Sequence, residues 1–165
     1  MSIVVDIQTI SIAVASASVV AGVVYYALQI KHQGKTRHTD MIMRLYSHSG
    51  SKEMVEAIHK VLMAEYKDYD DFVKRYGPII SKDPVSIAIG MVISFYEGIG
   101  ILVHRKLVDV DIVMELFVAN AIWEKIRPVI EGARKHYDIP SLCEWFEYLY
   151  NEMKKREQKL QQSKT

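Results

Sequence analysis

The stretch IQTISIAVASASVVAGVVYYALQI, from Ile7 to Ile30, carries no charged side chain over 24 residues. A helix rises about 1.5 Å per residue, so this stretch would reach about 36 Å, whereas the hydrocarbon core of a bilayer is about 30 Å thick. Its length and lack of charge therefore predict a transmembrane helix near the start of the sequence.

A cleaved signal peptide, a buried core helix and an interfacial helix are the alternatives to a span. A signal peptide has a basic start and an apolar core of about 7–15 residues. Here the start, MSIVVDIQ, has no Lys or Arg, although Ala-x-Ala patterns at 13–15 and 15–17 keep cleavage open. A core helix rarely needs so many uncharged residues. An interfacial helix has a charged face, which this stretch lacks.

The charges that flank the stretch predict its orientation. Its N-terminal side has no basic residue, whereas Lys31, Lys35 and Arg37 follow it closely. Basic residues are retained on the cytoplasmic side of a membrane. We therefore expect a single-pass protein of the cell membrane, with its N-terminus outside and its C-terminal domain in the cytoplasm.

Small residues line one side of the predicted span. Ala13, Ala17 and Ala21 recur every four residues, and Ser18 and Gly22 repeat this spacing beside them. Small side chains at this period let two helix backbones approach closely in lipid. This face predicts packing against a second copy or another membrane protein, and the alternative is that it simply faces lipid.

The rest of the 165-residue chain has the length of one ordinary domain. The whole chain has 21 basic and 20 acidic residues, which balance, so composition indicates no nucleic-acid partner. The one cysteine, Cys143, excludes an intramolecular disulfide and is compatible with a cytosolic domain. The sequence contains no Walker motif, GxGxxG fingerprint or CxxC pair.

The chain after the basic flank reads as helices, and no strand-like alternation competes with them. The fold predicted is all-α: one N-terminal transmembrane helix followed by a four- or five-helix cytoplasmic bundle. The domains expected are an anchor with its basic flank at 1–38, a helical bundle at 39–153 and a basic tail at 154–165. Cap residues and apolar spacing predict helices at 52–66, 69–76, 84–106, 109–137 and from 140 onward.

The segment that opens at Asp83-Pro84 is the most apolar part of the expected bundle. Between Val85 and Val103 only Glu97 is charged, and these 19 residues are barely long enough to form a second transmembrane helix. A charge within a span is costly, and the neighbouring amphipathic helices need an apolar partner. We therefore expect a central buried helix, with a second membrane segment as the alternative.

Four charged residues within apolar helix faces form the candidate interior polar site: Glu97, Glu124, Arg127 and Glu147. Converging carboxylates could bind a metal or carry protons. The alternative is structural, with Glu97 or Glu147 paired to Arg127 or Arg134, because an unpaired buried charge is expensive.

Two other features have weaker chemical interpretations. Glu56 and His59 have the ExxH spacing of di-iron bundles, but those sites need two such motifs, so a solvated surface is expected. Cys143 has no nearby histidine in sequence and is expected to pack as a small apolar residue. The sequence therefore predicts no catalytic residue, metal or cofactor.

The order of segments also resembles a known pattern. After the N-terminal span and basic flank come FYEGIGILVHRKLVDVDIV, WEKIRPVIEGAR and FEYLYNEM. From about residue 10 to 155 the chain resembles an uncharacterised family of small prokaryotic membrane-anchored proteins with a helical domain of unknown function. The resemblance implies architecture but no reaction, and a site shared with the family would contain Glu97, Trp123, Glu124 and Arg127.

The function expected is that of a non-enzymatic, membrane-anchored accessory subunit or protein-interaction module at the inner membrane face. Its partners would be the lipid bilayer and either a membrane protein or a second copy bound through the span. The alternatives are a metal-binding or enzymatic bundle that uses interior carboxylates, and a membrane effector or pore assembled through the span.

Overall fold

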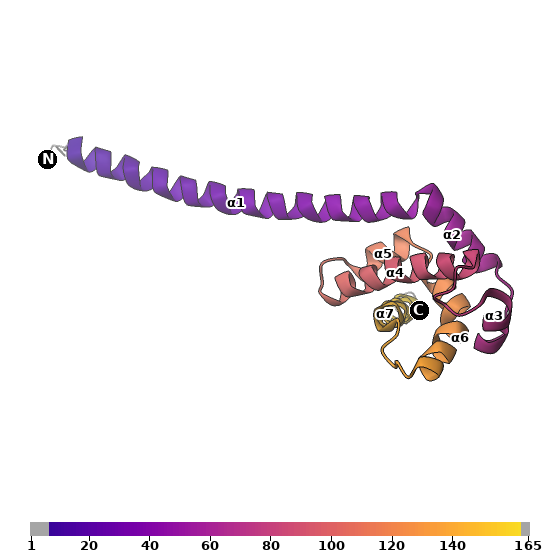
Figure 1. Ribbon diagram of the computed structural model, residues 1–165. Helices are drawn as coiled ribbons and strands as arrows, with labels where there is room; N and C mark the ends of the chain where they lie inside the picture. Colours follow the sequence, from indigo (N-terminus) through magenta and orange to yellow (C-terminus); the bar gives the residue numbers. More distant parts are fainter. Residues whose placement is uncertain (1–6, 163–165) are drawn as a thin grey trace. The chain divides into compact units, whose positions relative to one another are not determined.

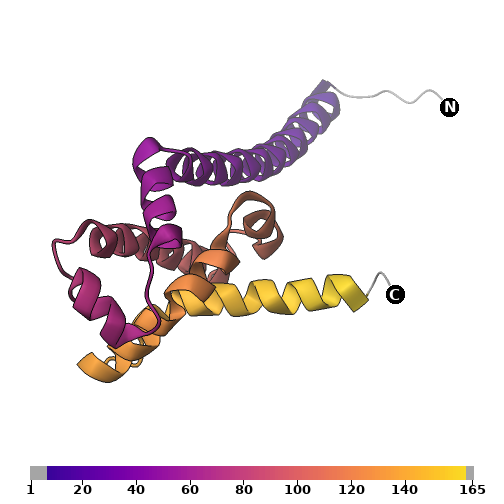
Figure 2. The same ribbon diagram turned by 90° about the vertical axis from the view of Figure 1, so that its right-hand side faces the viewer.

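The computed structural model of the chain describes residues 7–162, with side chains at 14–29 and 39–162. These residues form helices and no strand, which confirms the all-α class (Figures 1 and 2). The helices are α1 (Ile7–Ser49), α2 (Lys52–Met63), α3 (Tyr69–Tyr76), α4 (Pro84–His104), α5 (Val110–Leu116), α6 (Ala119–Tyr137) and α7 (Glu144–Gln162).

The chain divides into two compact units, Met1–Met41 and Ile42–Thr165. The predicted anchor lies within the first unit, and the predicted bundle lies almost wholly within the second. The first part of the predicted basic tail continues α7, which extends to Gln162.

Helix α1 contains the uncharged stretch that predicted a span. Its described apolar segment, Val14–Gln29, is exposed except for the half-buried Gly22. The Ser18 hydroxyl donates to the carbonyl of Val14 at 2.8 Å, so it is satisfied within the helix. By length and composition, the helix that could cross a membrane within the described residues is α4, which is partly buried in the second unit.

Several predicted helix boundaries are confirmed. The Ser51 hydroxyl accepts from the amide of Met54 at 3.2 Å and caps α2, and the Asp83 carboxylate accepts from the amide of Val85 at 2.8 Å and caps α4. Helix α3 ends at Gly77 as expected. Helix α2, however, ends at Met63 rather than at residue 66.

Two other predicted helices differ more strongly from the structure. The helix expected over 109–137 is interrupted where Phe117 adopts an extended backbone, and its buried ring lies 5.8 Å from the ring of Phe95. Packing of that ring interrupts a segment that has no local breaker. Helix α6 then continues through Pro128. The last helix begins at Glu144 rather than at Pro140, because Cys143 before it adopts a left-handed backbone (φ 60°).

Helix α4 is the centre of the second unit and packs mainly against α7 and α2. The rings of Tyr96 and Phe146 stack at 4.7 Å, and Trp123 of α6 meets Phe146 at 5.1 Å. Gly100 allows this approach, since a Cβ atom there would lie 2.1 Å from the carbonyl oxygen of Trp145. The preference for a buried α4 therefore agrees with the packing.

Helix α3 packs on α6 by a second close approach. A Cβ atom at Gly132 would lie 2.1 Å from the Cβ atom of Tyr69. The Tyr66 hydroxyl donates to the carbonyl of Lys125 at 2.8 Å, one turn before Pro128. Because Pro128 has no amide hydrogen, the carbonyl of Glu124 lacks its helical donor. The Tyr66 hydroxyl binds the next carbonyl, that of Lys125.

Candidate functional site

Glu97 of α4 caps the first turn of α7. Its Oε1 atom accepts a hydrogen bond from the amide of Phe146 at 2.6 Å, and the amide of Trp145 also donates to the carboxylate. The first amides of a helix have no partner inside it, so they need an acceptor from elsewhere. Glu97 provides that acceptor from another helix.

Arg134 of α6 reaches the same end of α7. Its NH2 group lies 2.7 Å from Oε2 of Glu147, and its Nε donates to the carbonyl of Leu142 at 2.8 Å. Only 17% of the Arg134 side chain is exposed, against 38% for Glu147. Glu97, Arg134, Leu142, Phe146 and Glu147 together make up what we call the α7 joint, which connects α4, α6 and α7.

Burial sets the ionisation of the groups at the α7 joint. It raises the pKa of Glu97 above its ordinary value, and this effect outweighs the hydrogen bonds from Phe146 and Trp145, which lower the pKa. Burial also raises the pKa of the neighbouring Cys143 thiol to about 12. At neutral pH Cys143 is therefore a protonated, poorly nucleophilic thiol, which fits the expected apolar packing.

The other two residues of the predicted interior site lie apart from the α7 joint. Glu124 accepts from the Tyr150 hydroxyl at 3.0 Å and lies 3.7 Å from the Lys154 ammonium. Arg127 lies 3.8 Å from Glu131, and about half of each of the Glu124 and Arg127 side chains is exposed. The structure therefore brings Glu97 and Glu147 together at the α7 joint, whereas Glu124 and Arg127 each have other partners.

The separation follows from the buried face of α6. Its inward residues are Ile122, Trp123, Ile126, Val129, Ile130 and Ala133. Glu124 and Arg127 lie outside this stripe and reach the solvent edge, whereas Arg134 turns toward α7. Sequence reasoning included Arg134 only as a pairing partner, because Arg127 also follows a buried residue and sequence position does not distinguish the two.

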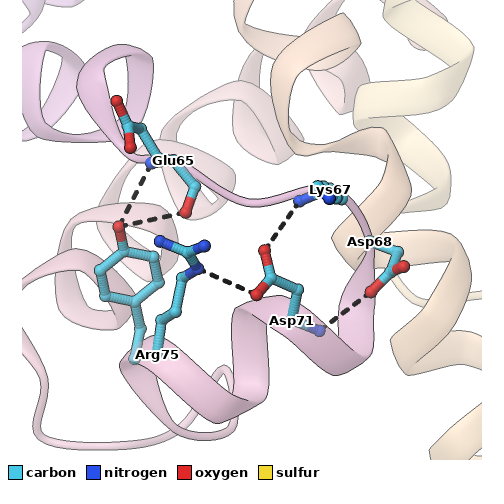
Figure 3. A network of polar contacts seen from close by, with 6 residues as sticks. Glu65, Lys67, Asp68, Asp71 and Arg75 are labelled. Carbon is cyan, nitrogen blue, oxygen red and sulfur yellow. Dashed lines mark hydrogen bonds and ion pairs between the residues drawn. The ribbon is translucent and has the colours of Figure 1, made fainter.

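A third polar group, not predicted, fixes the loop between α2 and α3 (Figure 3). The Asp71 carboxylate accepts from the amide of Lys67 at 3.2 Å and from Nε of Arg75 at 2.9 Å, while Asp68 caps the amide of Asp71 at 2.9 Å. The hydrogen bond from Arg75 lowers the pKa of Asp71. These contacts are local and exposed, so the network stabilises a turn rather than forming a reaction centre.

Two surface hollows have polar linings. One, of about 290 Å³, lies beside α5 and α7, where Arg156 makes a bidentate ion pair with Asp111 at 2.6 Å. The other, of about 560 Å³, lies between the start of α3 and α6 and includes Asp70 and Lys135. Both carry acidic and basic groups. Within the described residues, no three His, Cys, Asp or Glu side chains are grouped to hold a metal.

The predicted packing face of the span is exposed as far as its side chains are described. Ala17, Ser18 and Ala21 are exposed, and a Cβ atom at Gly22 would meet nothing within 4 Å. The side chain of Ala13 lies outside those described, as do those of Lys31, Lys35 and Arg37. Glu56 and His59 are both exposed, and Glu56 lies 3.9 Å from Lys52.

The described part of the chain thus defines a class: an all-α domain whose polar side chains connect its helices, together with a long N-terminal helix. The chain belongs to the family described as a domain of unknown function, DUF4760, whose pattern matches residues 12–153. No curated protein and no solved structure was found to match. The match begins inside the uncharged stretch and ends within α7, so the family pattern includes most of that stretch and the first half of α7.

Proposed function

We propose that the protein is a membrane-anchored, non-enzymatic helical module that binds a protein partner at the inner face of the cell membrane. The observation that carries the proposal is the uncharged stretch Ile7–Ile30 in one helix, with basic residues only on its C-terminal side. Such charge asymmetry supports a cytoplasmic location of the following domain.

The exposure of α1 supports the anchor. The six large aliphatic side chains of its described apolar segment are each more than half exposed: Val14 (61%), Val19 (66%), Val20 (63%), Val23 (65%), Val24 (53%) and Leu28 (62%). A helix that is apolar all round needs to be covered, and a bilayer covers it without another protein segment.

The α7 joint supports a binding rather than a chemical role. Glu97 accepts hydrogen bonds from amides of α7, and Glu147 forms an ion pair with Arg134. These two carboxylates of the predicted interior site therefore already have partners within the fold, and their contacts connect helices. A domain of this kind can present a rigid surface at the membrane to a partner.

Cysteine labelling of intact cells tests the proposal. A Gln162→Cys variant should react with a membrane-impermeant maleimide only after lysis, whereas a Ser2→Cys variant should react in intact cells. The buried Cys143 gives the background in the parent chain. Release of the chain by alkaline carbonate would contradict the anchor, and labelling of Gln162→Cys from outside would contradict the orientation.

A further inference from the structure

One face of α4 is exposed, although α4 is the central helix of its unit. Its residues follow one another at alternating steps of three and four, and all are exposed: Pro84, Ile87, Met91, Ser94, Gly98, Ile101 and Arg105, the last directly after the helix. Ile87 is 51% exposed, Met91 39% and Ile101 36%. We call this row the α4 seam.

The spacing of the α4 seam is that of a helix–helix interface. Apolar residues that recur every 3.5 residues on average form the contact line between two helices that pack side by side. A Cβ atom at Gly98, or at the neighbouring Gly90, would meet nothing within 4 Å, so both positions leave room for another backbone. The Ser94 hydroxyl donates to the carbonyl of Gly90 at 2.9 Å and is satisfied within its own helix.

Three pairs of positions on the seam and its flanks match about Ser94, although the counterpart of Met91 is Glu97, whose carboxylate accepts from α7. Gly90 and Gly98 lie four residues to either side of Ser94, and Ile87 and Ile101 lie seven residues to either side. At eleven residues the pair is Asp83 and Arg105, which carry opposite charges. A two-fold interface uses the same patch on both subunits, so the patch must complement itself when its direction is reversed.

We propose that two copies of this chain associate through their α4 seams as an antiparallel pair, with the two-fold axis at Ser94. In this arrangement Ile87 of each copy packs against Ile101 of the other, and glycines face glycines near the centre. Asp83 of each copy faces Arg105 of the other. A parallel pair would instead place Arg105 against Arg105, and like charges across an interface oppose association.

The pair would add a second contact to the anchored module proposed above. Chains confined to a membrane meet at a high effective concentration, which would favour the pair further. The inference rests on the described side chains of α4 and stands even without the anchor. A negative result in the cysteine-labelling experiment above would therefore leave the outcome of the cross-linking experiment below open, and the reverse is also true.

Disulfide cross-linking of the full chain in membranes of expressing cells tests the antiparallel register. Ser94→Cys should give a dimer band with itself under mild oxidation. Ile87→Cys and Ile101→Cys should each remain monomeric alone but give a dimer when the two variants are co-expressed. Lys60→Cys, exposed on α2, is the control and should not cross-link. An Ile87→Cys dimer formed alone would overturn the antiparallel arrangement, and equal cross-linking of Lys60→Cys would overturn the seam.

Substitutions that the fold tolerates separate association from folding. Gly98→Leu places its side chain in open space, so its helical circular dichroism and melting transition should persist. In a chain that also carries Gly22→Leu, which blocks association through the span, Gly98→Leu should then shift the full chain in detergent from dimer to monomer in sedimentation. Arg105→Asp should also weaken the dimer, because it would face Asp83. A dimer unchanged by Gly98→Leu, or a chain that is monomeric before any substitution, would overturn the proposal.

Discussion

The carboxylate of Glu97 on α4 accepts the amide hydrogen of Phe146 on α7 at 2.6 Å, across 49 residues of sequence. A helix start is usually capped by a residue directly before it. Here the preceding residue, Cys143, is buried and has a left-handed backbone, and the cap comes from a neighbouring helix. The cap is therefore also a tertiary contact, and it connects the position of α4 to the start of α7.

Removing this cap should destabilise the fold. Glu97→Ala leaves the amides of Phe146 and Trp145 without their acceptor, and we expect a loss of about 1–3 kcal/mol in the free energy of unfolding. Glu97→Gln keeps an oxygen acceptor and should lose clearly less. Thermal unfolding of the full chain in detergent, followed by circular dichroism, measures both variants. Equal stability of parent and Glu97→Ala would show that the cap does not matter energetically.

The same residue should make stability depend on pH. Burial raises the pKa of Glu97 in the folded chain, so the folded state holds this proton more tightly than the unfolded state does. Stability contributed by the group is then present at low pH and falls as pH rises from the ordinary carboxyl pKa through the raised one. The melting temperature of the parent should therefore decrease, relative to that of Glu97→Gln, as pH is raised over this window. A difference that stays constant or grows with pH would contradict this sign.

Arg134 and Arg127 are a matched pair on α6. Arg134→Ala removes the partner of Glu147 and of the Leu142 carbonyl from a mostly buried position, and should cost about 2–3 kcal/mol. Arg127→Ala breaks only an exposed contact with Glu131 and should cost less than about 1 kcal/mol. Chemical denaturation measures the free energy of unfolding of both variants. A larger loss for Arg127→Ala than for Arg134→Ala would contradict the assignment of the stabilising ion pair to Arg134 and Glu147.

Gly100 and Gly90 make a second matched pair, on α4. Gly100→Ala would place Cβ 2.1 Å from the Trp145 carbonyl oxygen, so α7 must move, and a loss of about 1–3 kcal/mol is expected. Gly90→Ala meets nothing within 4 Å and should gain up to about 1 kcal/mol from helix propensity. Melting temperatures that shift in opposite directions would support the close approach of α4 and α7. A stabilised Gly100→Ala chain would contradict it.

The small face of the predicted span has its own control. Gly22→Leu should weaken association in a bacterial membrane dimerisation assay, because the added side chain blocks close approach of two backbones. Val20→Leu changes a residue off that face and should leave the signal unchanged. Equal signals from the two variants would mean that the small residues face lipid.

Local chemistry made much of the fold predictable. Side-chain caps at Ser51 and Asp83 and the glycine at position 77 act within a few residues of the helix ends they determine. The interruption at Phe117 was not predictable in the same way. Its cause is the contact with Phe95, which is distant in sequence, and the residues around Phe117 contain no proline or glycine.

The candidate site was predictable only in part, because some of its contacts also join residues that are distant in sequence. A lone charge in an apolar helix identified Glu97 as a residue that needs a partner. The partner is a backbone amide, which no residue type identifies in a sequence. Glu124 and Arg127 both follow the buried Trp123 within one helical turn, and sequence spacing alone did not distinguish the edge of that helix face from its centre.

The distant cap also affects how far α7 is an autonomous segment. A peptide of residues 144–162 would carry the helix but not the acceptor for its first amides, so its first turn should fray in isolation. During synthesis the first turn of α7 would become stable only after α7 has packed against α4, whereas the C-terminal part of α7 does not depend on Glu97. Grafting α7 onto another scaffold would require a new cap residue at position 143, because the acceptor of its first amides, Glu97, belongs to α4 and would not be transferred.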